Sequence, residues 1–129
     1  MTETKKLEDL YTDSSLLDEE EIASTIFPLI AIQKNTKKIF IKSEESTHQQ
    51  KIVAYVLAKK LLASNGEIES DRIFASEVLK DLGLKRGTVD GELGKLRKKR
   101  ILITDKKTDG YEIPVYKIKE ALEILTKNK

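Results

Sequence analysis

The densest group of chemically capable side chains lies between residues 85 and 100, where seven Lys or Arg residues stand beside two acidic ones. Lysine ammonium groups neutralise phosphates, and an arginine guanidinium pairs with a flat acceptor edge through two parallel hydrogen bonds. The chemistry that this segment predicts is the non-covalent recognition of a polyanion, without bond making or breaking.

Residues suited to catalysis or metal binding are scarce. The chain has one histidine, His48, and no cysteine, which excludes disulfides and thiolate zinc sites. The acidic residues at 18–21 are consecutive, so on a helix they point in different directions instead of converging as catalytic pairs do. The sequence shows neither a phosphate-cradling glycine loop nor metal-ligand spacing. We therefore expect no enzymatic activity, no cofactor and no metal, with His48 as an ordinary surface residue.

Charge is distributed unevenly along the chain. Residues 1–24 contain eight acidic and two basic residues, whereas residues 85–129 contain thirteen basic and seven acidic ones. The acidic end is expected to be either a solvated, flexible terminus over residues 1–14 or a segment that folds over the basic surface. Because the chain shows no cysteine, no signal segment and no apolar run of about 18 residues, we expect a cytoplasmic protein without membrane contact.

The elements that must position the basic segment begin with an N-terminal extension, residues 15–42. Residues 15–27 have the spacing of a short helix with its acids in the first turns, and Pro28 ends it. Two β-branched runs, 29–32 and 38–41, predict a hairpin in which Ile30 and Ile32 meet Ile39 and Ile41. Two strands alone are marginal in water, so this hairpin must pack on the rest of the chain.

A long helix is expected over residues 43–64, capped by Ser43 or Ser46 and stopped by Asn65-Gly66. A shorter helix follows at 75–82 and is broken by Gly83. The next helix, from Thr88 to Arg100, carries one apolar stripe. An apolar strand at 101–104, a polar turn and a return strand at 111–113 complete this part. The stripe of that helix is formed by Val89, Leu93 and Leu96.

The run ASEVLKDLGLKRGTVDGELGKLRKKRILI resembles the transcriptional regulators of the winged helix-turn-helix superfamily. The likeness lies in a leucine-glycine-leucine turn, a Thr-Val pair and leucines spaced through a helix into an apolar strand. It covers residues 48–113 when the long helix is counted as the first of three. It implies an α+β, mainly α fold with a winged helix-turn-helix domain at 43–113, and a DNA-binding transcriptional regulator as the function.

In such a regulator, helix 85–100 enters the major groove and the wing at 104–111 meets the DNA backbone. Arg86 is the candidate for reading a guanine, whereas Lys85, Thr88, Lys95 and Lys98 suit phosphates. The complete set of candidate DNA-binding residues is Lys85, Arg86, Gly87, Thr88, Asp90, Gly91, Lys95, Lys98, Lys106 and Lys107.

Two features of this helix complicate the expectation. Asp90 and Glu92 bring negative charge beside phosphates unless basic neighbours neutralise them, although an aspartate can also accept a hydrogen bond from cytosine. Gly87, Gly91 and Gly94 share one helical face, although each glycine costs about 0.8–1 kcal/mol relative to alanine. That flat face suits close approach of either DNA or another helix. The basic run 97–100 has the alternative of a solvated helix end that complements the macrodipole.

A final helix is expected over residues 114–129, with Pro114 at its first position. Its apolar face suits either a homodimer or packing back onto its own hairpin. The alternative to DNA binding is a winged-helix module that binds a partner protein within a larger, nucleic-acid-processing assembly, since the fold alone does not fix the function. The face consists of Val115, Ile118, Ala121, Leu122 and Leu125.

Overall fold

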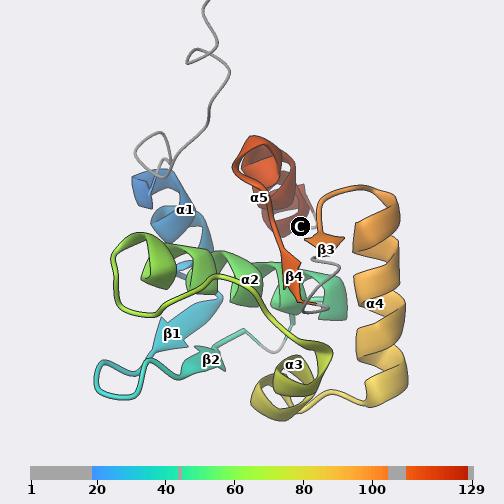
Figure 1. The fold of residues 1–129 in the computed structure, drawn as a ribbon, viewed down its shortest axis with the longest axis horizontal. Helices are drawn as coiled ribbons and strands as arrows, with labels where there is room; N and C mark the ends of the chain where they lie inside the picture. Colours follow the sequence, from blue (N-terminus) through green and yellow to red (C-terminus); the bar gives the residue numbers. More distant parts are fainter. Residues whose placement is uncertain (1–18, 44, 105–109, 128–129) are drawn as a thin grey trace, which may run out of the picture.

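The computed structural model describes residues 19–43, 45–104 and 110–127 (Figure 1). These residues form five α-helices, a 3₁₀ helix and two two-stranded antiparallel sheets, which confirms the α+β, mainly helical class. The elements are α1 (Glu19–Ile26), β1 (Ile30–Ile32), β2 (Ile39–Ile41), α2 (His48–Ser64), α3 (Ala75–Leu82), α4 (Arg86–Lys98), β3 (Ile103–Thr104), β4 (Tyr111–Glu112), η3 (Val115–Lys117) and α5 (Ile118–Lys127).

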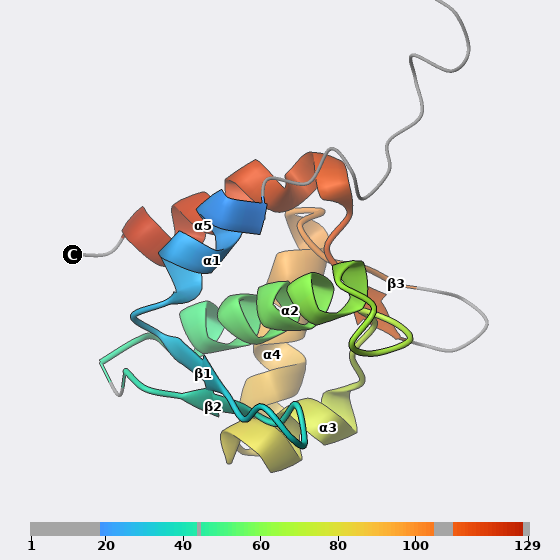
Figure 2. The same cartoon turned by 90° about the vertical axis from the view of Figure 1, so that its left-hand side faces the viewer.

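Helix α2 is the centre of the molecule (Figure 2). Every residue from Ile52 to Ala58 is fully buried, so this part of the helix is covered on all sides. The sequence predicts a single apolar stripe, so the buried surface of α2 is larger than predicted. The cover comes from α1, the β1–β2 hairpin, α4 and α5, all of which contact α2. One continuous core therefore joins the N-terminal extension, the middle of the chain and the C-terminal helix.

The start of α2 differs from the prediction. Thr47, and neither Ser43 nor Ser46, caps the helix: its hydroxyl accepts a hydrogen bond from the Gln50 N–H at 3.1 Å. The Gln50 side chain accepts one from the Thr47 N–H at 3.0 Å, which completes a capping box. Ser46 and Thr47 each have a glutamine three residues later, and in the structure the Gln50 side chain completes the box with the Thr47 N–H. His48 is exposed, as expected.

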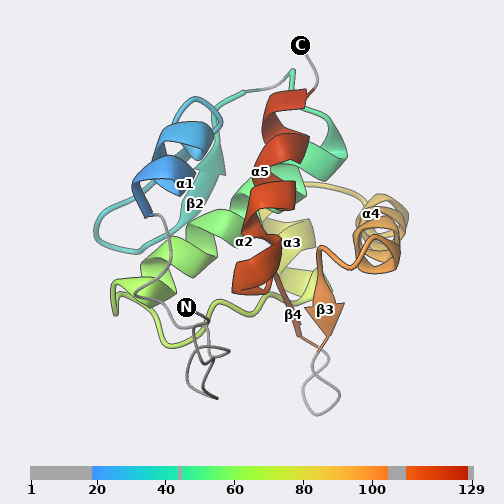
Figure 3. The ribbon, with the colours of Figure 1, turned by 90° about the horizontal axis from the view of Figure 1, so that it is seen from above.

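Helix α1 is joined to the C-terminal end of α2 through Glu19. Residues 15–18 of the predicted helix lie outside the described residues, and Ile22 and Ile26 bury its apolar side. The Glu19 carboxylate accepts hydrogen bonds from the Ser64 hydroxyl at 2.5 Å and the Asn65 amide at 3.3 Å. Figures 1 and 3 place α1 and α4 on opposite sides of the molecule, so the three acids of α1, Glu19, Glu20 and Glu21, lie away from the basic helix α4.

The β1–β2 hairpin has the predicted register. Ile30 pairs with Ile41 and Ile32 with Ile39. Ile30 and Ile39 turn into the core, whereas Phe40, on the opposite face of β2, is 44% exposed. The hairpin gains its stability from packing on α2, as an isolated pair of strands requires.

Helices α3 and α4 follow in close succession. α3 has the predicted bounds, and Gly83 ends it in the left-handed conformation (φ +66°). The predicted bounds of α4 are 88–100, but the helix spans Arg86–Lys98. It begins earlier because Lys85 is extended and its carbonyl accepts the first helical hydrogen bond, from the Val89 N–H. It ends earlier because Arg100 has a left-handed φ of +64°. Val89, Leu93 and Leu96 are buried, which confirms the predicted stripe.

A small sheet follows α4. Thr104 of β3 pairs with Tyr111 of β4, while the expected strand residues Ile101 and Leu102 are buried and bond through their N–H groups to the Leu96 carbonyl. Ile73, between α2 and α3, exchanges two 2.8 Å backbone hydrogen bonds with Tyr111 and so adds a third strand position, which the sequence did not predict.

The C-terminal segment begins with the 3₁₀ turn η3, capped by Pro114, in place of one continuous helix. The apolar face of α5 is buried against α1 and α2, not on the hairpin. The apolar face suggested for a dimer is thus already covered within the chain. A homodimer through residues 114–129 stays a prediction, and it would have to use another face of α5.

Candidate nucleic-acid interface

The outward side of α4 is the candidate site. At 100° per residue, the direction opposite the buried stripe is occupied by three glycines and two lysines. All five are exposed to solvent, and no other described element covers them. The five residues are Gly87, Gly91, Gly94, Lys95 and Lys98.

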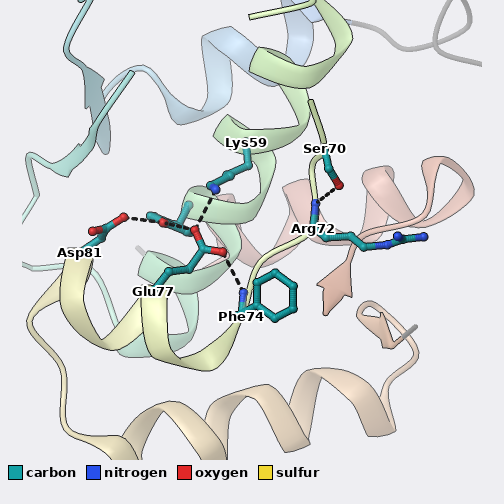
Figure 4. A network of polar contacts seen from close by, with 7 residues as sticks. Lys59, Ser70, Arg72, Phe74, Glu77 and Asp81 are labelled. Atoms are coloured by element: carbon teal, nitrogen blue, oxygen red, sulfur yellow. Dashed lines mark hydrogen bonds and ion pairs between the residues drawn. The ribbon is translucent and has the colours of Figure 1, made fainter. Parts of the chain in front are cut away.

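A polar network fixes α3, and with it the start of α4, to the central helix (Figure 4). The fully buried Tyr55 hydroxyl of α2 lies 2.6 Å from an Asp81 oxygen and 3.0 Å from a Glu77 oxygen, both on α3. Lys59 pairs with the same Glu77 oxygen at 2.7 Å, and the second Glu77 oxygen accepts the Phe74 N–H at 2.9 Å. Burial, and then the hydrogen bond to Asp81, raise the pKa of Tyr55 far above its usual value.

The two acidic residues of α4 both have basic neighbours. Asp90 lies 3.6 Å from the Arg86 guanidinium, one turn away, and Glu92 lies 3.6 Å from the Lys95 ammonium. Glu92 also accepts a 3.5 Å hydrogen bond from Gln49 of α2, which draws it toward the body of the protein. The negative charge of Asp90 and Glu92 is therefore neutralised by neighbouring basic side chains.

The three glycines of α4 face open space. A Cβ added at Gly87, Gly91 or Gly94 would meet no other atom within 4 Å. None of them has a positive φ, so the backbone conformation does not require glycine. Intramolecular packing thus gives no reason for glycine here. The helix has a flat outer surface on which another molecule can approach its backbone closely.

Five cations around α4 have no ion-pair partner in the described part of the chain. Residues 85–100 carry seven Lys or Arg residues, two of which, Arg86 and Lys95, are paired. A helix C-terminus carries only about half a negative charge, so the macrodipole offsets a small part of this positive charge. The unpaired residues are Lys85, Arg97, Lys98, Lys99 and Arg100, all exposed.

Most of the predicted site residues lie together. Lys85 is the N-cap of α4 and Arg86 its first residue, both exposed, whereas Thr88 is half-buried on the flank and is less accessible than expected. Asp90 and Gly91 lie on the exposed side of the helix. Lys106 and Lys107, which were expected in a wing, lie outside the described residues.

Sequence reasoning missed several residues that lie beside this surface. Arg97, Lys99 and Arg100 were counted in the basic segment, with a solvated helix end as the alternative, but were not among the candidate DNA-binding residues. Tyr116, which is 72% exposed, was not singled out. A signal was present for Tyr116, because it is an aromatic residue that falls off the apolar face of residues 114–129. Arg100 is distinguished by its left-handed backbone conformation, which cannot be predicted from the sequence.

Three comparisons with known proteins give no match. No protein-family model, no curated protein and no solved structure matches the chain. Within residues 19–43, 45–104 and 110–127, no cluster of His, Asp or Glu has the grouping needed to hold a metal ion. No helix of the described segments is long and apolar enough to cross a membrane.

Proposed function

We propose that this protein binds double-stranded DNA as a winged helix-turn-helix regulator, with α4 in the major groove. The observation that carries the proposal is the outer side of α4: a flat glycine face beside exposed, unpaired cations, with both acidic residues neutralised by neighbours. An α-helix fits the major groove, and a surface without side chains lets its backbone approach closely.

The order of elements supports the winged-helix part of the proposal. A first helix, α2, leads to Ile73, then α3 and α4, then the hairpin strands β3 and β4. Ile73 forms a one-residue bridge with Tyr111 of β4, so the segment before α3 adds a third strand position beside the β3–β4 sheet. That order and pairing are what a helix-turn-helix with an adjoining β-wing requires.

Within this proposal, each part of α4 has a separate role. Arg86, at the N-terminal end, contacts base edges, because the first turn of a groove helix comes nearest to them. Lys98 and the neighbouring cations contact phosphates, which supply affinity and register but no sequence preference. The Thr104–Tyr111 segment, with Lys106 and Lys107, is assigned to the DNA backbone on the sequence resemblance alone.

A salt titration tests the proposal. Binding of a fluorescently labelled, mixed-sequence duplex is measured by anisotropy at several salt concentrations. If about five phosphates are neutralised, log affinity falls against log salt with a slope of about −4 to −5, and Lys98→Ala makes it shallower by about 1. Lys34→Ala is the matched control: it removes an equal charge from the exposed turn of the hairpin, remote from α4 (Figure 3).

Arg86→Ala is expected to weaken binding to preferred sequences more than to random ones, since a base contact carries about 1–3 kcal/mol of discrimination. Absence of duplex binding at low salt by the folded protein would refute the DNA proposal. An unchanged slope in Lys98→Ala would remove α4 from the interface.

A protein-binding module is the second candidate. The outer side of the N-terminal extension exposes Phe27 at 71% and Phe40 at 44%. Lysine ammonium groups lie over both rings, Lys42 at 4.3 Å from the Phe27 centroid and Lys38 at 5.5 Å from that of Phe40. Exposed aromatic residues that gather on one surface are typical of protein contacts. If the folded protein does not bind duplex DNA at low salt, that result would favour this second candidate function.

A further inference from the structure

A hollow of about 550 Å³ opens beyond the C-terminal end of α4. It lies where α4, β3 and η3 meet, and Figures 1 and 3 show β3 between α4 and α5. Its described lining contains three basic residues and no acidic one. Its lining includes Arg97, Arg100, Ile103, Tyr116 and Lys117.

The hollow presents an aromatic ring to solvent. Tyr116 is 72% exposed and Ile103 beside it 37%, whereas the other apolar residues of η3 and α5 pack against the core. A large exposed ring next to an apolar side chain gains little in the isolated protein, but it offers a surface on which another flat ring can stack.

The guanidinium groups of Arg97 and Arg100 have no ion pair with any described residue, and both side chains are exposed. Lys117 differs from them, because its ammonium group pairs with Glu120 at 3.0 Å. The two arginines are therefore the cations that remain for an incoming anion. The planar fork of arginine suits phosphate oxygens.

The left-handed backbone conformation of Arg100 independently indicates a role for its side chain. The Arg100 N–H bonds to the Arg97 carbonyl at 2.9 Å and the Ile101 N–H to the Leu96 carbonyl at 3.0 Å, the two hydrogen bonds of a Schellman motif. α2 ends with the same pair of bonds, and there the left-handed residue is Gly66. At α4 an arginine occupies this position (φ +64°), although a left-handed conformation disfavours residues with a Cβ.

We propose that this hollow binds an unpaired nucleotide, with its base stacked on Tyr116 and its phosphate held by Arg97 and Arg100. A nucleotide joins one flat ring to one phosphate, which matches an exposed aromatic side chain beside two unpaired guanidinium groups. The location next to α4, and hence next to a duplex, rests on the proposed function. The site then receives a single-stranded end or a base that has left the stack.

The test compares four probes by anisotropy: a blunt duplex, the same duplex with a short overhang, the single strand, and an acidic peptide of similar charge. Stacking of a base on one aromatic ring is worth roughly a five- to 150-fold change in affinity. We expect the overhang to bind at least about fivefold more tightly than the blunt duplex. Tyr116→Ala should abolish that gain and Tyr116→Phe should keep it.

Arg100→Gly separates binding from folding. Glycine suits the left-handed position, so this variant should raise the melting temperature while it reduces the advantage of the overhang. Lys119→Ala, an exposed charge removal on α5, is the control and should leave the advantage unchanged.

Each result has a separate meaning. Equal binding of blunt and overhanging duplexes, or equal losses for both with Tyr116→Ala, would overturn the nucleotide site. Tyr116-dependent binding of the acidic peptide would overturn it as well, in favour of a protein ligand. Binding of the single strand and the overhang without binding of the blunt duplex would support this site and refute the duplex proposal.

Discussion

The hydroxyl of Tyr55 should have a large, measurable effect on stability, because it is a buried link between α2 and α3. Tyr55→Phe removes one oxygen and leaves the ring, so packing is preserved and no cavity forms. The oxygen lies 2.6 Å from Asp81 and 3.0 Å from Glu77. Hydrogen bonds to charged groups contribute about 1.5–3 kcal/mol. The side chain of Glu77 is 26% exposed, so water replaces part of the loss. We expect the free energy of unfolding to fall by about 2 kcal/mol.

The same hydroxyl predicts a dependence on alkaline pH. Burial and the neighbouring carboxylates raise the pKa of Tyr55 in the folded protein, whereas in the unfolded chain it is about 10. Its contribution to stability is therefore complete below about pH 10 and decreases as the pH rises above that value. At about pH 11 the loss is about 1.4 kcal/mol. Tyr55→Phe lacks this loss, so the difference between parent and variant should shrink to about 0.6 kcal/mol.

Urea unfolding followed by circular dichroism measures both effects, and it suits a chain without tryptophan. The parent and Tyr55→Phe are compared at neutral pH and at about pH 11, so that lysine titration common to both cancels in the difference. Tyr116→Phe is the matched control, since it removes a hydroxyl from a ring that is 72% exposed. A difference below about 0.5 kcal/mol at neutral pH, or one that stays constant with pH, would refute the assignment.

Two further substitutions test the design of α4. Gly91→Ala should raise the free energy of unfolding by about 0.5–1 kcal/mol, because its Cβ would enter open space, and should weaken duplex binding measured by anisotropy. Stabilisation with unchanged affinity would show that the glycine face does not contact DNA. Leu93→Ala, at a site 1% exposed, should cost about 2–5 kcal/mol in urea unfolding. The exposed Lys95→Ala beside it should change stability by no more than about 0.5 kcal/mol, and equal effects would contradict the buried stripe.

The parts of the fold that sequence predicts well are those with local signals. Gly83 ends α3 at the expected residue, and the spacing of Val89, Leu93 and Leu96 gives the buried side of α4. The hairpin register follows from matching β-branched residues across a short turn. In each case the deciding information lies within a few residues of the element.

The missed features depend on distant contacts or on competition between similar residues. Ile73 stands between a polar stretch and the start of α3, without the alternation of a strand, and only its pairing with Tyr111 makes it part of a sheet. Thr47 was missed as the cap of α2 although Gln50 stands at the position that completes a capping box. For the candidate site, the glycine face was predictable from helical spacing. The meeting of Arg97, Arg100 and Tyr116 was not, because two elements separated by a hairpin bring them together.

The burial of α2 on every side has a consequence for how the molecule unfolds. The sides of this helix that face α1, the hairpin and α5 would be open to water in a fragment limited to residues 43–113. The N-terminal extension and α5 therefore supply part of the hydrophobic packing that α2 needs. Amide protons of α2 should report global unfolding, because no smaller opening uncovers them. The basic helix thus belongs to a single cooperative unit that includes both ends of the described chain.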